Sequence, residues 1–425
     1  MSRVFAAELT WTGERFERDV RLAVDAVGKI TAVGQELGAV TDRLPRTALL
    51  PGFVNVHSHA FQRGLRGRGE TFPAGAGSFW TWREAMYELV TTLGPDAFEA
   101  VCLQAFCEMR RAGITTVGEF HYLHHAHPDA PDFELDFRVL EAAKAAGIRL
   151  VLLQSWYAHG GPGRPLAGGQ RHFRTASLDA FWAQVDRLEK AIDPTTQSLG
   201  LAPHSIRAAT PGEFAELHAE AQRRGMVVHF HAEEQPIEID ECLAAYGKRP
   251  LALLLDLLPI GPESTAVHAT HTTPTDLARF AATGATVCLC PTTEGNLGDG
   301  ISNLPDFLAA SGHVAFGSDS NARISTLDEM RWCELVQRLA RQKRGIVLDA
   351  DGDVAPRLLH FATRGGARSL GIPTGRLEPG HWADFVLVDL DALELAGVPE
   401  DHLADALVFG CGERVIAGTV VGGRS

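Results

Sequence analysis

Two pairs of histidines share one spacing, and each pair belongs to an apolar stretch. His57 and His59 close FVNV, and His229 and His231 occur in VVHFHAE. Alternate side chains of a β-strand point to the same face, so each His-x-His pair sends two imidazoles to one side of a sheet. A single buried histidine is most often a hydrogen-bonded core residue, but Asp319 ends a further apolar stretch in VAFGSDSN. Imidazole and carboxylate are ligands that Zn²⁺ accepts, so the pattern predicts a metal centre with one place open for water.

The middle of the chain repeats a unit of strand, polar loop and helix that could position these ligands. The expected strand ends lie in residues 55–59, 115–122, 149–157, 199–205, 227–233, 265–271, 286–294 and 314–321. Helical periodicity separates them, as at 95–112 and 210–224, and a glycine follows where a left-handed cap would lie. Eight such units predict an α/β fold, a (β/α)8 TIM-like barrel over residues 50–371, with its chemistry at the carboxyl ends of the strands. A doubly wound sheet is the alternative, but no glycine-rich phosphate turn follows the first strand.

The two chain ends have a different character from the middle. Residues 1–49 and 372–425 alternate short strand-like stretches with glycine turns, as in RLAVDAVGKITAVG and ERVIAGTVVGGRS. We therefore expect both ends to pair in one small β-sandwich domain beside the barrel.

Composition narrows the class of protein further. The net charge is −14, with acidic and basic residues interspersed, which argues against a nucleic-acid or anionic-membrane surface. No stretch approaches the roughly 18 apolar residues that a membrane helix needs. Seven cysteines without a framework spacing suit a reducing compartment, so we expect a cytoplasmic protein. Cys288 and Cys290 alternate along an apolar strand and are expected to be core residues.

Together these motifs resemble the amidohydrolase superfamily of metal-dependent barrel hydrolases and deaminases, over essentially the whole chain. The resemblance implies the metal ligands His57, His59, His231 and Asp319, and leaves His229 with a structural role. Two-metal members commonly carry a carboxylated lysine after the fourth strand, but none of the five lysines here lies at a strand end. We therefore expect one metal ion per chain, zinc by preference, with iron as the alternative.

The same resemblance implies a catalytic set. HFHAEEQ matches the His-x-x-Glu arrangement of mononuclear deaminases, in which the glutamate protonates the leaving nitrogen while Asp and a sixth-strand His hold the attacking water. The matching residues are Glu234, Asp319 and His268. Glu233 and His271 are the alternatives. Spacing favours Glu234, and His268 is favoured because it directly ends the apolar run. Protonation of nitrogen makes ammonia a better leaving group, which points to deimination or deamination.

The stretch HSHAFQRGLRG, with FHYLHH, APHSIRA and CPTTEGNLGDG, resembles the branch of the superfamily that deiminates N-formimino-L-glutamate in histidine degradation. Such an anionic small molecule carries two carboxylates, so its pocket should offer cationic groups opposite the metal. The matching positions imply that Gln62, Arg83, Tyr122, His204 and Arg207 bind substrate. A deaminase of aminopurines or related rings is the alternative, and would need an aromatic stacking pocket. A non-catalytic metal-binding scaffold is disfavoured because Glu234 is present, and a homodimer is expected only from the prevalence of two-fold assemblies.

Overall fold

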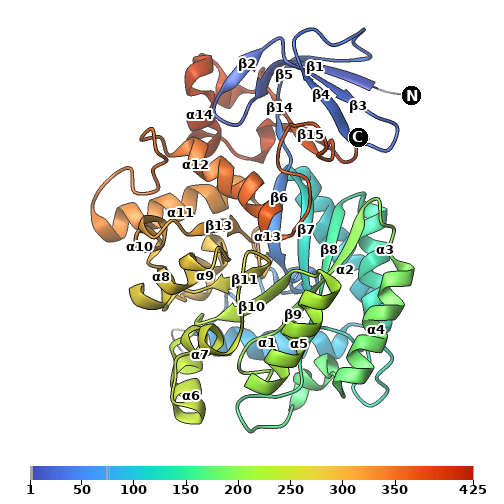
Figure 1. Cartoon of the computed structure of the whole chain (residues 1–425), viewed down its shortest axis with the longest axis vertical. Helices are drawn as coiled ribbons and strands as arrows, with labels where there is room; N and C mark the ends of the chain where they lie inside the picture. Colours follow the sequence, from blue (N-terminus) through green and yellow to red (C-terminus); the bar gives the residue numbers. More distant parts are fainter. Residues whose placement is uncertain (1–2, 73–74, 76, 425) are drawn as a thin grey trace.

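The computed structural model describes residues 3–72, 75 and 77–424, and its larger unit is built on an eight-stranded parallel sheet (Figure 1). The strands follow chain order around the sheet: β6 (Phe53–Ser58), β7 (Ile114–His121), β8 (Arg149–Trp156), β9 (Gln197–Pro203), β10 (Val228–Ala232), β11 (Ser264–His268), β12 (Thr286–Leu289) and β13 (His313–Phe316). The first and last strands meet beyond their ends, where the Asp319 N–H donates to the His57 carbonyl at 2.9 Å and the His59 N–H donates to the Asp319 carbonyl at 2.9 Å. The predicted barrel is thus confirmed, and its closure brings residues 57–59 against residue 319.

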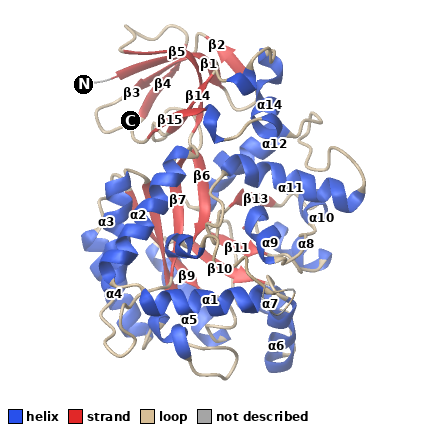
Figure 2. Cartoon of the chain, turned by 180° about the vertical axis from the view of Figure 1, so that it is seen from behind, coloured by secondary structure: helices blue, strands red, loops and turns tan. Residues whose placement is uncertain are grey.

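Helices cover the outside of this sheet (Figure 2). Those of the barrel unit are α1 (Phe79–Thr92), α2 (Pro95–Arg111), α3 (Glu134–Ala146), α4 (Leu178–Ala191), α5 (Pro211–Arg224), α6 (Pro236–Tyr246), α7 (Pro250–Leu257), α8 (Pro274–Ala282), α9 (Pro291–Leu297), α10 (Leu304–Ala309), α11 (Thr326–Arg341), α12 (Ala355–His360) and α13 (Gly366–Ser369). Helix α5 shows why the local sequence defines them. Thr210 and Glu213 form a capping box, Pro211 occupies the first turn, and Gly225 ends the helix at φ 68°. None of the described helices is long and apolar enough to cross a membrane.

A second sheet of seven strands joins the two chain ends, as predicted. Its strands are β1 (Arg3–Trp11), β2 (Phe16–Arg18), β3 (Arg21–Val24), β4 (Ile30–Gly34), β5 (Asp42–Pro51), β14 (Phe385–Asp389) and β15 (Ile416–Val420). Strand β5 pairs in parallel with β1 and antiparallel with β14, so it connects the N-terminal and C-terminal parts. Helix α14 (Leu403–Gly410) lies between β14 and β15 in the chain. The boundaries expected between the two units stay a prediction, and residues 1–2 and 425 lie outside the described residues.

A buried ion pair ties this small sheet to the barrel. Arg149, at the start of β8, donates from Nε to Asp384 Oδ2 at 2.7 Å and from Nη2 to Oδ1 at 3.1 Å. Both side chains are almost fully buried, and Arg149 also lies over the Trp382 ring. A bidentate pair of this kind fixes geometry as well as charge. The small sheet therefore contacts the amino-terminal side of the barrel and leaves the carboxyl ends of the strands for the site.

Candidate active site

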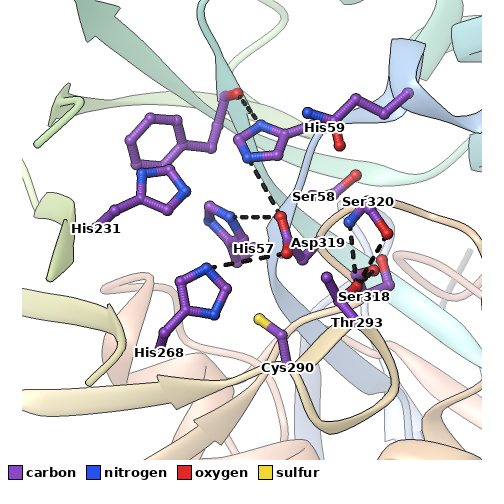
Figure 3. A network of polar contacts seen from close by, with 12 residues as sticks. His57, Ser58, His59, His231, His268, Cys290, Thr293, Ser318, Asp319 and Ser320 are labelled. Carbon is purple, nitrogen blue, oxygen red and sulfur yellow. Dashed lines mark hydrogen bonds and ion pairs between the residues drawn. The ribbon is translucent and has the colours of Figure 1, made fainter. Parts of the chain in front are cut away.

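Four side chains that could hold a metal ion converge inside the barrel. Ligand atoms of His57, His59, His231 and Asp319 all lie within 4.8 Å of one another, and all four residues are buried (Figure 3). Asp319 Oδ1 lies 3.2 Å from His57 Nε2 and 3.3 Å from His59 Nε2. His57 lies in β6 and His59 directly follows it, while His231 lies in β10 and Asp319 in the loop after β13. Closure of the barrel therefore assembles the group.

Hydrogen bonds hold the imidazole rings of His59 and His231 in the tautomer that a metal ligand needs. His59 Nδ1 donates to the Phe120 carbonyl at 2.8 Å, and His231 Nδ1 donates to the His204 carbonyl at 3.0 Å. Each bond fixes the tautomer that leaves Nε2 as a lone-pair donor. Burial lowers the pKa of His59 to about 3 and lowers that of His57 and His231 as well, so the rings stay neutral at pH 7. His57 Nδ1 is buried without a hydrogen-bond partner among the described residues. Three neutral imidazoles and one carboxylate fit a Zn²⁺-type ion.

His229 is the other member of the β10 pair and lies outside this group. Its Nε2 donates to the Ser369 carbonyl at 3.1 Å, and it is fully buried. This contact is the structural role expected for it.

Several residues at the strand ends have left-handed backbone conformations, and three of them belong to the residues considered for the site. Glu233, His268 and Asp319 have φ values of 55°, 69° and 45°. Residues other than glycine enter this region at an energetic cost, and such strain concentrates at functional sites. Here the turns redirect the chain at the ends of β10, β11 and β13, where the candidate ligands and acids lie.

The candidate catalytic residues lie beside the metal ligands. His268 Nε2 is 3.7 Å from Glu234 Oε1 and 3.9 Å from Asp319 Oδ2, while His268 Nδ1 is 3.4 Å from Glu294 Oε1. Burial disfavours protonation of His268, but the carboxylates around it outweigh burial and raise its pKa well above the ordinary value. Burial raises the pKa of Glu234, which favours its protonated form.

The two alternatives point elsewhere. The Glu233 carboxylate accepts from Arg249 Nη2 at 3.3 Å and from the Leu251 N–H at 3.3 Å. His271 Nε2 donates to the Asp299 carbonyl at 2.8 Å. Glu234 and His268 line the central cavity, whereas Glu233 and His271 are absent from its lining.

A cavity of about 480 Å³ opens above these groups. Its lining includes every residue assigned to substrate binding from the sequence: Gln62, Arg83, Tyr122, His204 and Arg207. The same lining includes His59, His231, Glu234, His268 and Asp319, while His57 lies behind it. None of the five lysines reaches this cavity. The structure therefore brings the residues of all the quoted motifs to one space, although their roles stay a prediction.

Arg83 and Arg207 are two of the three arginines that line the cavity. The Arg83 guanidinium lies 4.1 Å from the Trp80 ring centre and 5.5 Å from that of Tyr87. Arg207 is 13% exposed, and its Nη2 lies 3.7 Å from Glu234 Oε2. The Nε atoms of both arginines are buried without a hydrogen-bond partner among the described residues. Buried donors of this kind are suited to an anionic ligand, because leaving them unpaired is costly.

Polar and aromatic groups complete the wall. Gln62 Nε2 donates to the Tyr122 hydroxyl at 2.6 Å, and the His204 ring stacks on His231 with centres 4.6 Å apart. Burial raises the pKa of Tyr122 well above its ordinary value, so its hydroxyl keeps its proton.

Sequence reasoning missed an aromatic part of the lining. Trp80 and Tyr87 lie on α1 with Arg83, and Tyr157 follows β8. A usable signal was present, because positions 80, 83 and 87 are three and four residues apart and share one helix face. Glu294, which contacts His268, was also missed, although it lies in the quoted CPTTEGNLGDG stretch.

Cys288 in β12 and Cys290, which follows that strand, are both buried, as expected. Cys290 Sγ lies within 4.8 Å of ligand atoms of His268 and Asp319, and 4.0 Å from Cys288 Sγ. Burial raises the pKa of the Cys290 thiol well above its ordinary value. A thiol that keeps its proton is a poor metal ligand, so the histidines and Asp319 remain the better donor set.

Comparison with known proteins places this geometry in a family. The amidohydrolase family model matches residues 48–425. Formimidoylglutamate deiminase from Pseudomonas aeruginosa is 40% identical, covering 100% of this chain and 94% of its own length. A 5-methylthioadenosine/S-adenosylhomocysteine deaminase from Natronomonas pharaonis is 30% identical, covering 95% of this chain and 87% of its own. The crystal structure of an amidohydrolase from Brucella melitensis superposes with a TM-score of 0.91 at 35% identity, covering 99% of this chain and 94% of its own. The chain belongs to the amidohydrolase family.

Proposed function

We propose that the protein is a formimidoylglutamate deiminase, which hydrolyses N-formimino-L-glutamate to N-formyl-L-glutamate and ammonia in histidine degradation. The observation that carries the proposal is the 40% identity over the whole chain to the Pseudomonas enzyme of that name. The cavity supports it, because Arg83 and Arg207 offer unpaired buried donors to a substrate that carries two carboxylates.

The proposed roles follow from the positions of the side chains. Arg83 and Arg207 bind the carboxylates, while Gln62, Tyr122 and His204 orient the formimino group toward the metal ligands. A divalent metal bound at His57, His59, His231 and Asp319 would lower the pKa of a coordinated water to about 7 and so supply hydroxide. His268 Nε2 and Asp319 Oδ2 hold the attacking water, and Asp319 Oδ2 accepts its first proton. Glu234 transfers protons to the former imino nitrogen, which leaves as ammonia. The two protons of the water replace them, the second being lost as the hydroxyl of the tetrahedral adduct becomes the carbonyl of the formyl group.

We propose zinc, one ion per chain, as the cofactor. The donor set of three imidazoles and one carboxylate supports it, and iron is the alternative that binds similar ligands. We also propose that the protein works in the cytoplasm and forms a homodimer. Seven cysteines that form no disulfide support a reducing compartment such as the cytoplasm.

A ring deaminase is the second candidate, and the aromatic lining favours it. Trp80, Tyr87 and Tyr157 offer faces on which a purine could stack, and 5-methylthioadenosine/S-adenosylhomocysteine deaminases are among the relatives. The arginines weigh against it, since an uncharged ring would leave their buried donors unpaired.

Ammonia release from a substrate panel separates the two candidates. Purified, zinc-loaded protein is offered N-formimino-L-glutamate in one set of reactions and aminopurine nucleosides in another. We expect ammonia from the first alone. Release only from an aminopurine would replace the substrate and keep the deaminase chemistry, and release from neither would contradict an enzymatic role for this site.

Replacing Arg83 with Met should chiefly raise KM for N-formimino-L-glutamate. A hydrogen bond to a charged group contributes about 1.5–3 kcal/mol, so we expect KM to rise by roughly tenfold to a hundredfold. Arg83 tests this more cleanly than Arg207, which also approaches Glu234. Steady-state kinetics give the split between KM and kcat.

Arg164→Met is the matched control, because Arg164 lines the same cavity but its guanidinium pairs with Glu241 at 2.6 Å. We expect it to change KM by less than about threefold, as for an exposed ion pair. An unchanged KM in the Arg83 variant would favour the ring deaminase.

A further inference from the structure

A second group of buried polar side chains lies outside the barrel wall, between β7, β8, α3 and α4. At its centre is Asp136, the third residue of α3, which is completely buried. Its Oδ1 accepts from His121 Nε2 at 2.9 Å and from His124 Nδ1 at 2.9 Å. Its Oδ2 accepts from Gln154 Nε2 at 2.6 Å and from Gln184 Nε2 at 2.9 Å. We call these five residues the Asp136 cluster.

The cluster has the donor types of a metal site, since His121, His124 and Asp136 offer ligand atoms within 4.8 Å of one another. Its hydrogen bonds indicate a different use. His124 Nδ1 faces the Asp136 carboxylate, and its Nε2 lies 2.9 Å from the Ser155 carbonyl oxygen. The nearest neighbour of each ring nitrogen is an acceptor at 2.9 Å, whereas the Gln154 amide lies farther from Nδ1, at 3.4 Å. Protons on both ring nitrogens satisfy the two acceptors, and neither nitrogen then keeps a lone pair for a metal.

The result is a buried ion pair between the His124 imidazolium and the Asp136 carboxylate. Burial alone would raise the pKa of Asp136, but the neighbouring histidines outweigh burial and hold that pKa below its ordinary value. A buried pair is weak evidence for stability, since removing two charges from water is costly. A buried network whose central group is fully hydrogen-bonded does, however, hold its members in one arrangement.

The Asp136 cluster holds the chain at His121 and His124, on either side of Tyr122, which lines the substrate cavity. Side chains alternate along β7, so His121 points to the helices while Tyr122 lines the cavity. The Phe120 carbonyl orients the metal ligand His59. The Tyr122 ring lies 4.8 Å from the His59 ring, centre to centre, and its hydroxyl accepts from Gln62. His124 also hydrogen-bonds to Asp136, so the chain is fixed to Asp136 both before and after Tyr122.

We propose that the Asp136 cluster is a positioning device for the active site, which holds residues 120–124 so that Tyr122 meets the substrate and the Phe120 carbonyl meets His59. The kinetic part rests on the proposed function, because Tyr122 acts there as a substrate-binding residue. The cluster touches neither substrate nor metal and acts through these two positions.

The protonation of His124 can be measured without any substrate. In ¹⁵N-detected NMR of the full-length protein at pH 7, we expect His124 to show two protonated ring nitrogens, because each faces an acceptor oxygen. Asp136→Asn should remove one of these signals, because the amide cannot stabilise the imidazolium. One unprotonated ring nitrogen in the unmodified protein at pH 7 would overturn the proposed network.

A double-mutant cycle tests whether the cluster acts through Tyr122. His121→Gln should lower kcat/KM by about tenfold, since a small displacement of a positioned group costs one or two orders of magnitude. In a Tyr122→Phe background the same change should lower it by less than about threefold, because contacting positions are not additive. Equal factors in both backgrounds, or no effect in either, would overturn the proposal.

Two further variants complete the design. His218→Gln changes a buried histidine of α5 outside the cavity lining and should leave kcat/KM unchanged. Gln184→Met, on α4, removes one of the two glutamine donors to Asp136 Oδ2 and replaces His121→Gln if that variant does not fold. The double-mutant cycle is measured with whichever compound of the substrate panel yields ammonia. An incorrect substrate assignment is therefore detected by the panel, and an incorrect positioning role by the double-mutant cycle.

Discussion

Glu234→Gln is expected to lower kcat by roughly 10²–10⁴-fold, the range measured for loss of a general acid or base. The Glu234 carboxylate is buried at the cavity and lies 3.7 Å from His268 Nε2 through one oxygen and 3.7 Å from Arg207 Nη2 through the other. Glutamine has nearly the same shape and can keep one of these two contacts through its amide oxygen, while its amide nitrogen cannot accept. It has no acidic proton to give to the leaving nitrogen, so binding should survive while turnover fails.

Metal content and KM distinguish this loss from damage to the site. Elemental analysis should find the same metal content as in the unmodified protein, and KM should change by less than about threefold if only the transition state has lost an interaction. Glu233→Gln is the matched control, because that neighbouring carboxylate faces Arg249 and Leu251. Unchanged turnover in the Glu234 variant would remove it from the mechanism, and a loss confined to Glu233→Gln would exchange their roles.

Removal of the metal is the second large effect that we expect. Dialysis against a chelator should abolish ammonia release, and one equivalent of Zn²⁺ should restore it, because the site's neutral histidines cannot activate water alone. The melting temperature should fall with the metal, since a ligand that binds only the folded state stabilises it. Full activity in protein with less than about 0.05 metal ions per chain would contradict a metal-dependent reaction.

The two histidines of β10 provide a matched pair of variants. His231→Gln removes one of the four candidate ligands, and we expect the bound metal to fall at least tenfold after dialysis. His229→Gln removes a ring that bonds the Ser369 carbonyl, and we expect the metal content to stay within a factor of two. Equal losses in both variants would show that the four-residue group is not the ligand set.

The order and type of the elements could be predicted from sequence because they depend on short-range physics. Alternation of apolar residues defined the eight strands, and Gly147 and Gly225 adopt the left-handed cap conformation that their positions suggested. His57 and His59 could be placed on one face because the side-chain period of a strand is two. The likeness of several motifs to one family brought Gln62, Arg83 and Arg207 into one predicted pocket, and they line one cavity.

The position of each histidine along the barrel axis could not be predicted from these local sequence patterns. His57 and His229 are each the first member of a His-x-His pair, and both are fully buried. His57 joins the metal group, whereas His229 bonds to Ser369, 140 positions along the chain. The stagger of the strands in the closed barrel decides which residue of one strand lies opposite which residue of another. No local sequence pattern encodes that stagger.

Other contacts of the site depend on tertiary structure for the same reason. Sequence spacing favoured Glu234 over Glu233, and only the tertiary structure shows the left-handed turn at Glu233 and the Arg249 that contacts its carboxylate. The contacts of Asp136 join four separate elements, so nothing in FHYLHH alone indicated that two of its histidines share one carboxylate. By itself the sequence determined which elements form and which face each candidate residue takes, because those depend on neighbours along the chain. The tertiary structure decided which of these faces meet, because barrel closure and helix packing bring together residues that are distant in sequence.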